Sequence, residues 1–282
     1  MKAIIYLLLS MTLYTSCQQV QSKALVTSVA ENKKNVSYGK DTAQRMDIYL
    51  PAGRSAHSTP SIVLVHGGGW NSGDKSNFDV YIDTFQKRLP GYAIFNLNYR
   101  LVSSDHLFPT QELDVKAAMD HIAQNADHYG VSKDRFVLLG FSAGAHLAML
   151  QAYKYSTPEV KAVVNFFGPT DLTVMYKNPW HSMIPYLLRM LTGTTPAANA
   201  AVYQQSSPAH YVNTRSAPTI IFQGGKDNIV HPSQSHHLQK KLEKAGVPHE
   251  LVLYPGERHG WYGSNLSNSF DHIQEFLSTH VK

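Results

Sequence analysis

The sequence of 282 residues contains a single cysteine, few charged residues and no long basic run. One cysteine excludes an internal disulfide bond. Charged residues make up 16% of the chain and hydrophobic residues 43%, a composition that excludes an intrinsically disordered protein. The net charge of +5 is spread thinly, and no basic run exceeds Lys33-Lys34 or Lys240-Lys241. This distribution argues against a nucleic-acid-binding surface.

The N-terminal segment has the pattern of an export signal. A positively charged start precedes a short apolar core at 3–9, and small residues precede Cys17. Because the apolar core is too short to span a bilayer, we predict a signal peptide at 1–16. Residues 13–17 resemble a bacterial lipobox, with Tyr14 at a position that is usually aliphatic. We therefore expect lipid attachment at Cys17 and a cell-envelope lipoprotein, the alternative being ordinary cleavage to a periplasmic or secreted protein.

The remainder of the chain alternates apolar runs with helical patterns, and no internal repeat is present. Residues 17–35 are polar and predict a flexible tether after the lipid anchor, so the domain is expected at 36–282. Strands are predicted at 45–50, 61–66, 92–99, 135–139, 160–167, 217–223 and 250–254, and helices at 110–129, 238–245 and 270–281. This order predicts an α/β fold with a mostly parallel sheet covered by helices on both faces.

The segment 168–214 interrupts this alternation and contains several large apolar residues. It is expected to form a lid or a wall of a pocket. The alternative is an elaborated crossover connection without a role in binding.

A strand, a sharp turn and a helix surround the pentapeptide Gly140-Phe141-Ser142-Ala143-Gly144. This is the context of a nucleophile elbow, in which a serine is held in strained backbone dihedrals between two glycines. The glycines are needed because the turn brings backbone segments close together. The N-terminus of the following helix would direct free N–H groups at an oxyanion beside Ser142.

Other predicted strands end in residues suited to the same chemistry. His66-Gly67-Gly68-Gly69-Trp70 follows one strand, and its N–H groups could complete an oxyanion hole with that of Ala143. A dinucleotide fingerprint is excluded because Ser72 stands where its third glycine is required, which leaves a plain tight loop as the alternative. We expect the oxyanion donors to be Gly68, Gly69 and Ala143, and Trp70 to be a candidate substrate contact.

Asp227 and His259 follow two later strands, so the chain order is Ser142, Asp227, His259. In this order His259 would act as the base on Ser142, and Asp227 would orient its imidazole. Asp171 is the alternative acid, since it follows the strand after the elbow. No histidine spacing predicts a zinc site, and neither a metal nor a cofactor is expected.

Taken together, these motifs resemble the α/β-hydrolase superfamily, in its esterase branch with the His-Gly-Gly-Gly-Trp loop. The resemblance runs from about Asp41 to the C-terminus and extends to Asn98-Tyr99-Arg100-Leu101 and to 108–118. Phe141 replaces the glutamate common in hormone-sensitive-lipase-like members and points to the smaller relatives, which include acetyl-xylan and feruloyl esterases.

The resemblance implies carboxylic-ester hydrolysis through an acyl-enzyme, and the export signal favours an ester carried on a polysaccharide. Two alternatives stay open. One is an amide hydrolase of the arylformamidase type, and the other is a catalytically inactive binding member of the fold.

Overall fold

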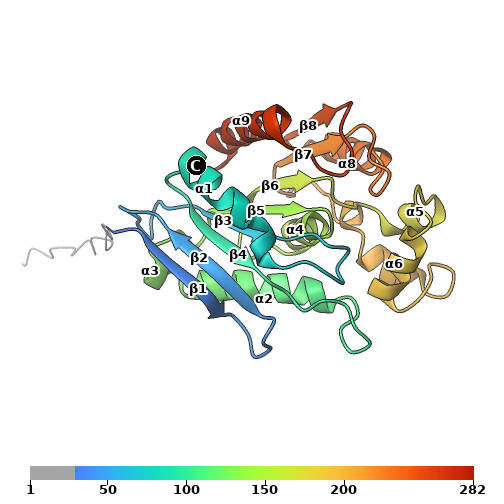
Figure 1. Cartoon of the computed structure of the whole chain (residues 1–282), viewed down its shortest axis with the longest axis horizontal. Coiled ribbons are helices and arrows are strands. Elements are labelled where there is room, and N and C mark those ends of the chain that lie inside the picture. The colour runs from blue at the N-terminus through green and yellow to red at the C-terminus, as the bar shows by residue number, and fades with distance from the viewer. Residues whose placement is uncertain (1–28) are drawn as a thin grey trace, which may run out of the picture.

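The computed structural model describes residues 29–282, in which eight strands form one sheet (Figure 1). The strand order is β1-β2-β4-β3-β5-β6-β7-β8. The antiparallel pairs are β1 with β2 and β2 with β4, and all later neighbours are parallel. The strands are β1 (Glu31–Ser37), β2 (Arg45–Leu50), β3 (Ser61–Val65), β4 (Ala93–Leu97), β5 (Phe136–Phe141), β6 (Val160–Phe166), β7 (Thr219–Gly224) and β8 (His249–Tyr254).

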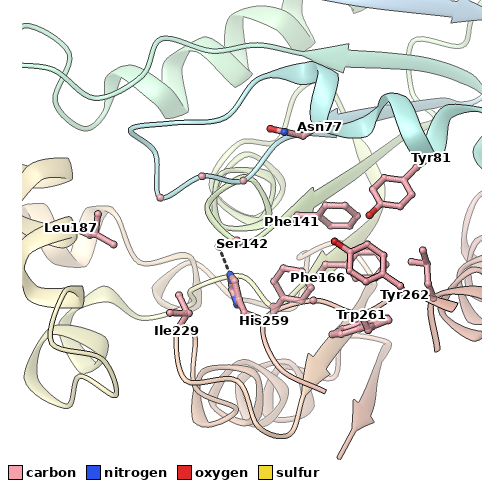
Figure 2. A pocket seen from close by; sticks show the side chains of 16 residues that line it. Asn77, Tyr81, Phe141, Ser142, Phe166, Leu187, Ile229, His259, Trp261 and Tyr262 are labelled. Carbon is pink, nitrogen blue, oxygen red and sulfur yellow. Dashed lines mark hydrogen bonds between the residues drawn. The ribbon is translucent and has the colours of Figure 1, made fainter. Parts of the chain in front are cut away.

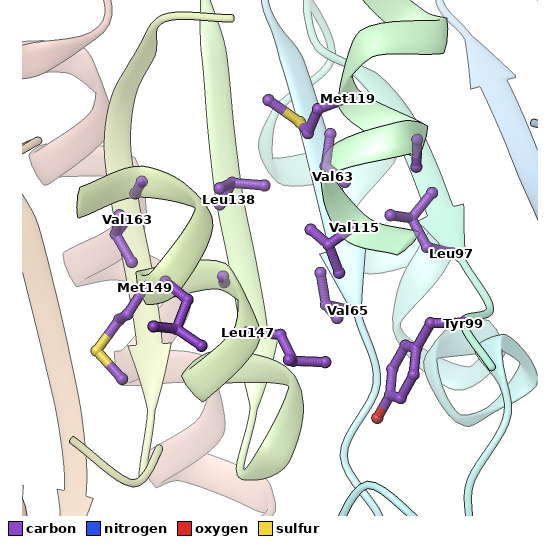
Figure 3. Close-up of a cluster of buried hydrophobic side chains, with 14 of the residues drawn as sticks. Val63, Val65, Leu97, Tyr99, Val115, Met119, Leu138, Leu147, Met149 and Val163 are labelled. Carbon is purple, nitrogen blue, oxygen red and sulfur yellow. The ribbon is translucent and has the colours of Figure 1, made fainter. Parts of the chain in front are cut away.

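Alternate side chains of the central strands enter two separate hydrophobic cores. Val63 and Val65 of β3 belong to the core under α2 (Thr110–Gln124), α4 (Ala143–Lys154) and α8 (Ser233–Ala245) (Figure 3). Ile62 and Leu64 belong to the core under α1 (Asp79–Arg88) and α9 (Gly263–His280). All four side chains are fully buried, and each such burial stabilises the fold by about 1.5–3 kcal/mol. A strand covered on both faces needs apolar residues throughout, which explains its continuous hydrophobic run.

The segment between β6 and β7 forms three short helices, α5 (Leu172–Lys177), α6 (Ile184–Thr192) and α7 (Ala200–Gln205). Asp171 and Asn199 cap α5 and α7 by accepting hydrogen bonds from backbone N–H groups, and left-handed Gly193 ends α6. In Figure 1 the arrows of β5 and β6 point toward the side of the molecule that carries α5 and α6. This segment, 168–214, therefore lies near the edge of the sheet where the site is expected.

The remaining elements are short. Two 3-10 turns, η1 (Lys75–Phe78) and η2 (Pro208–His210), precede α1 and β7. The helix predicted at 110–129 is split into α2 and α3 (Ala126–Tyr129), and it ends at left-handed Gly130 as expected for a glycine cap.

The predicted α/β architecture is confirmed, and all seven predicted strands are present within two residues of their expected bounds. One correction concerns the N-terminal boundary. Residues 31–35, assigned to the tether, form part of β1 and pair with β2. The strand was missed because it lies at the sheet edge, where its polar residues stay partly exposed and show no apolar alternation.

The predicted signal peptide at 1–16, lipid attachment at Cys17 and tether residues up to 28 lie outside the described residues. Within 29–282, no helix combines the length and the hydropathy required to cross a membrane.

Candidate active site

Ser142 sits in a strained turn between β5 and α4. Its backbone has φ 54° and ψ −119°, a conformation that costs an L-residue about 1–3 kcal/mol and persists only where the surroundings enforce it. A Cβ added at Gly140 would overlap the N–H of Ala145, and one added at Gly144 would overlap the carbonyl oxygen of Val65. The expected reason for both glycines, close approach of backbone to backbone, is confirmed.

His259 connects Ser142 with Asp227, and Figure 2 shows its hydrogen bond to Ser142. Its Nε2 lies 2.8 Å from Ser142 Oγ, and its Nδ1 lies 2.7 Å from Asp227 Oδ2. Because a carboxylate can only accept, Nδ1–H donates to Asp227 and leaves Nε2 free to accept from the serine hydroxyl. The fold thus brings His259 to Asp227, which lies 32 positions away along the chain, and to Ser142, which lies 117 positions away.

Asp227 is buried, with 2% of its surface exposed, and its oxygens are saturated with donors. Oδ1 accepts from the N–H groups of Ile229 and Val230, and Oδ2 accepts from His259 and from Gln223 Nε2. Gln223 is itself fixed by Ser235, whose hydroxyl donates to its Oε1. Gln223 was not predicted as a site residue, although its position at the carboxyl end of a predicted strand was a usable signal.

The alternative acid, Asp171, is occupied elsewhere. Its Oδ1 accepts from the N–H of Val174 as the cap of α5, and its Oδ2 lies 3.3 Å from His210 Nε2 and 3.8 Å from His237 Nε2. The structure therefore brings Asp227, and not Asp171, to His259.

The glycine loop lies beside the elbow. Gly68, Gly69 and Trp70 have φ values of 106°, 58° and 64°, and the N–H groups of Asn71 and Ser72 donate to the Gly68 carbonyl. Glycine is required at Gly68, because its φ is one that L side chains rarely adopt and an added Cβ would overlap the Ser72 carbonyl oxygen. Gly68 and Gly69 line the same cavity as Ser142. Ala143 directly follows Ser142 and is the first residue of α4.

Trp70 does not line this cavity, which corrects its expected role as a substrate contact. Its indole is buried, with 3% exposed, and its Nε1–H donates to His146 Nδ1 at 3.1 Å. His146 Nε2 lies 2.7 Å from the carbonyl oxygen of Ser206, so the ring is the neutral tautomer with its proton on Nε2. Burial lowers the pKa of His146 to about 4. One imidazole therefore links the glycine loop, the elbow helix and the segment 168–214.

His66 also supports the glycine loop. Its Nδ1 lies 2.7 Å from the Gly67 carbonyl oxygen, and its ring stacks on Tyr99 at 4.3 Å between centroids. The Tyr99 hydroxyl donates to the His66 carbonyl. Next along the chain, Arg100 pairs with buried Asp114 through Nε and a terminal nitrogen, which ties the end of β4 to α2. These contacts fix the loop without placing either His66 or Arg100 in the cavity.

The cavity at Ser142 has a volume of about 430 Å³ and extends to both sides of the serine and His259 (Figure 2). On one side, Leu187 of α6 and Ile229 form its wall. The other side is aromatic and is lined by Tyr81, Phe141, Phe166, Phe167, Trp261 and Tyr262, with Asn77 nearby. We call this second side the aromatic arm. The predicted pocket-wall role of 168–214 is met by Leu187.

Most residues of the aromatic arm were not predicted from the sequence. Phe166 and Phe167 end a predicted strand and Trp261 follows His259, so their places at the sheet edge were available as signals. Tyr81 lies on α1 and reaches the cavity only through tertiary packing, for which the sequence offers no signal. Within residues 29–282, no three His, Cys, Asp or Glu side chains are grouped to hold a metal ion.

Comparison with curated proteins finds esterases among the relatives. The chain is 26% identical over 245 residues to the esterase LipC of Mycobacterium tuberculosis, covering 82% of this chain and 60% of LipC. It is 28% identical over 234 residues to the esterase LipQ of the same organism, covering 77% of this chain and 54% of LipQ. The chain thus spans little more than half the length of these relatives.

Solved structures include an esterase of Thermogutta terrifontis, Est2, with propionate bound, at TM-score 0.71 and 26% identity over 89% of this chain and 94% of that one. A bifunctional GH43-CE protein of Bacteroides eggerthii matches at TM-score 0.77 and 26% identity, over 89% of this chain and 38% of that one. The fold is therefore that of the α/β-hydrolases. The BD-FAE family model matches residues 46–242, well over half of the chain. With the elbow, the glycine loop and the Asp227–His259 pair all in this fold, the chain belongs to the BD-FAE family.

Proposed function

We propose that this protein is an exported serine hydrolase that cleaves carboxylic esters. The observation that carries the proposal is the position of His259, within hydrogen-bond distance of both Ser142 Oγ and Asp227 Oδ2. This is the arrangement by which a base activates a serine and a buried carboxylate stabilises the imidazolium that forms.

In the proposed reaction, His259 Nε2 takes the proton of Ser142 as Oγ attacks the ester carbonyl. The oxyanion accepts hydrogen bonds from the N–H groups of Gly68 or Gly69 and of Ala143. His259 then returns the proton to the leaving alcohol oxygen, and the acyl group stays on Oγ. Water, activated in turn by His259, releases the acid and restores the serine.

We propose a short acyl or aryl ester as the substrate, such as an acetyl or feruloyl group on a polysaccharide. The aromatic arm supports an aryl acyl group, because its rings offer faces and edges for stacking. Tyr81, Tyr262 and Asn77 add hydroxyl and amide groups that could hydrogen-bond a ring substituent. The propionate in the Thermogutta esterase and the carbohydrate-esterase designation of the Bacteroides protein support the short acyl group and the glycan.

The proposal is tested with the purified full-length protein on p-nitrophenyl acetate, butyrate and octanoate, methyl ferulate, acetylated xylan and formylkynurenine. We expect turnover of the short or aryl esters, and its loss in Ser142→Ala. No turnover on any substrate, or equal rates in Ser142→Ala, would refute ester hydrolysis. Faster cleavage of formylkynurenine than of any ester would establish the amide hydrolase instead.

The role of the acid has its own matched pair of variants. Asp227→Asn should lower kcat by about 10⁴-fold, as expected when a triad imidazole is held in the wrong tautomer. Asp171→Asn should keep most of the activity, because Asp171 is engaged with α5, His210 and His237. The reverse pattern would transfer the role to Asp171.

We also propose that the protein is a lipoprotein of the cell envelope, on the evidence of residues 1–17 alone. A lipid at Cys17 would leave the residues before β1 as the tether. Metabolic labelling with a fatty acid should mark the wild-type protein and fail to mark Cys17→Ala. A label that persists in Cys17→Ala would contradict attachment at this residue.

A further inference from the structure

Trp180, in the segment that precedes α6, is exposed and stacks on His231, in the loop that follows Asp227. The ring centroids of Trp180 and His231 lie 3.6 Å apart, and their planes differ by 3°. Trp180 is nevertheless 61% exposed. Because the imidazole covers one face of the indole, the opposite face is the one presented to solvent. A single exposed aromatic residue is common on a protein surface, so the informative feature here is the ring held flat with one face open to solvent.

The imidazole beneath Trp180 is held in a fixed orientation. The N–H of Ser233 donates to His231 Nδ1 at 3.2 Å, and the Ser233 hydroxyl lies 3.0 Å from the same atom. His231 directly follows Val230, whose N–H donates to Asp227 Oδ1. The indole is thus positioned relative to Asp227 by a short, hydrogen-bonded stretch of chain.

This stretch also forms the wall of the cavity. Ile229, two residues before His231, lines the cavity on the side away from the aromatic arm, together with Leu187 (Figure 2). Trp180 and His231 do not line the cavity themselves, but His231 lies two residues after Ile229, and Trp180 belongs to the same segment, 168–214, as Leu187. We therefore place the stacked pair outside the Leu187–Ile229 side of the cavity. An ester joins an acyl group to an alcohol, and the aromatic arm offers space for one of these two parts.

We propose that Trp180, supported by His231, binds a neutral sugar ring on the alcohol side of the substrate. This inference rests on the proposed ester hydrolysis and adds the orientation of the substrate. The acyl group would lie in the aromatic arm, and the glycan would extend over Leu187 and Ile229 toward Trp180. The face of an aromatic ring is electronegative and attracts the weakly positive C–H bonds on one face of a pyranose. Exposed Asn178 and Ser182 flank Trp180 and supply polar groups for the sugar hydroxyls.

A sugar suits this surface better than a lipid bilayer. Tryptophans that anchor proteins to membranes insert their rings at the level of the headgroups, together with basic and apolar neighbours. Trp180 instead lies flat against another ring and offers a single planar face.

The test measures the binding of unesterified xylohexaose, cellohexaose and mannohexaose to the full-length protein by calorimetry and by tryptophan fluorescence. Fluorescence is informative because Trp70 and Trp261 are buried, with 3% and 5% exposed, whereas Trp180 is not. We expect at least one oligosaccharide to bind, with affinity reduced about tenfold or more in Trp180→Ala. Trp180→Phe should keep part of the affinity, and His231→Ala should lose part of it.

Tyr186→Ala is the matched control, since Tyr186 is an exposed aromatic of the same segment that does not stack on His231. It should bind as the wild type does. Absence of binding to all three oligosaccharides, or equal affinity in Trp180→Ala, would overturn the proposal, as would a Trp180-dependent binding to phosphatidylglycerol vesicles in place of the oligosaccharides. Thermal unfolding confirms that each variant is folded.

The two proposals fail in different ways. Hydrolysis of p-nitrophenyl acetate that depends on Ser142, without binding of any oligosaccharide, would leave the esterase standing and remove the sugar subsite. Oligosaccharide binding that depends on Trp180, without turnover of any ester, would keep the sugar subsite and refute ester hydrolysis.

Discussion

Acidification from pH 8 to pH 5 should destabilise the fold through His146. Its side chain is fully buried, and burial lowers its pKa to about 4, against about 6.5 for an exposed histidine. Between these two values the unfolded chain binds a proton that the folded chain does not. The stability contributed by neutral His146 is therefore complete above about pH 6.5 and is lost as the pH falls toward 4.

The structure explains why the proton is excluded. In the neutral ring, Nδ1 accepts from Trp70 Nε1–H and Nε2–H donates to the Ser206 carbonyl. Protonation would place N–H groups of Trp70 and His146 face to face and leave a charge without a counterion. With the two pKa values, the expected loss is about 2 kcal/mol at pH 5 and about 3 kcal/mol below pH 4.

The measurement is denaturant unfolding by circular dichroism at several pH values between 8 and 5, for the wild type and for His146→Gln. The variant lowers stability at every pH, so the informative quantity is the pH dependence. We expect the wild type to lose about 2 kcal/mol more than His146→Gln over this range. His57→Gln, at an exposed position, should follow the wild-type pH dependence. Equal pH dependence in the wild type and His146→Gln would refute the reasoning.

Three further predictions concern the glycines, the buried ion pair and the aromatic arm. Gly144→Ala should lower the melting temperature by roughly 5–10 °C, because its Cβ would overlap a β3 carbonyl. Gly91→Ala, at a position with open space around it, should change the melting temperature little, and equal melting temperatures for the two variants would contradict the overlap. Asp114→Asn should cost about 2–3 kcal/mol in denaturant unfolding, since it removes the charge that pairs with Arg100, and a loss below 0.5 kcal/mol would count against that pairing. Phe141→Ala should lower the ratio of kcat/KM for methyl ferulate over p-nitrophenyl acetate by about tenfold, and an unchanged ratio would place the aryl group elsewhere.

Local chemistry made much of the site predictable. Strands buried on both faces require apolar runs, so their ends could be located, and Ser142, Asp227 and His259 all follow such ends. The elbow glycines were predictable because backbone contact there permits no side chain. In contrast, β1 could not be recognised, since an edge strand pairs through its backbone and leaves its polar side chains in solvent.

Sequence alone determined the fold class and the strand ends that meet near the serine, because parallel strands bring their carboxyl ends to one edge of the sheet. Only the tertiary structure decided between Asp227 and Asp171, since both follow strands and only the distance to His259 separates them. It also decided that Trp70 is buried against His146, whereas Trp180 is exposed on His231. A tryptophan has the same apolar ring and single donor in either setting. Its role depends on which face its neighbours cover, and those neighbours lie far away along the chain.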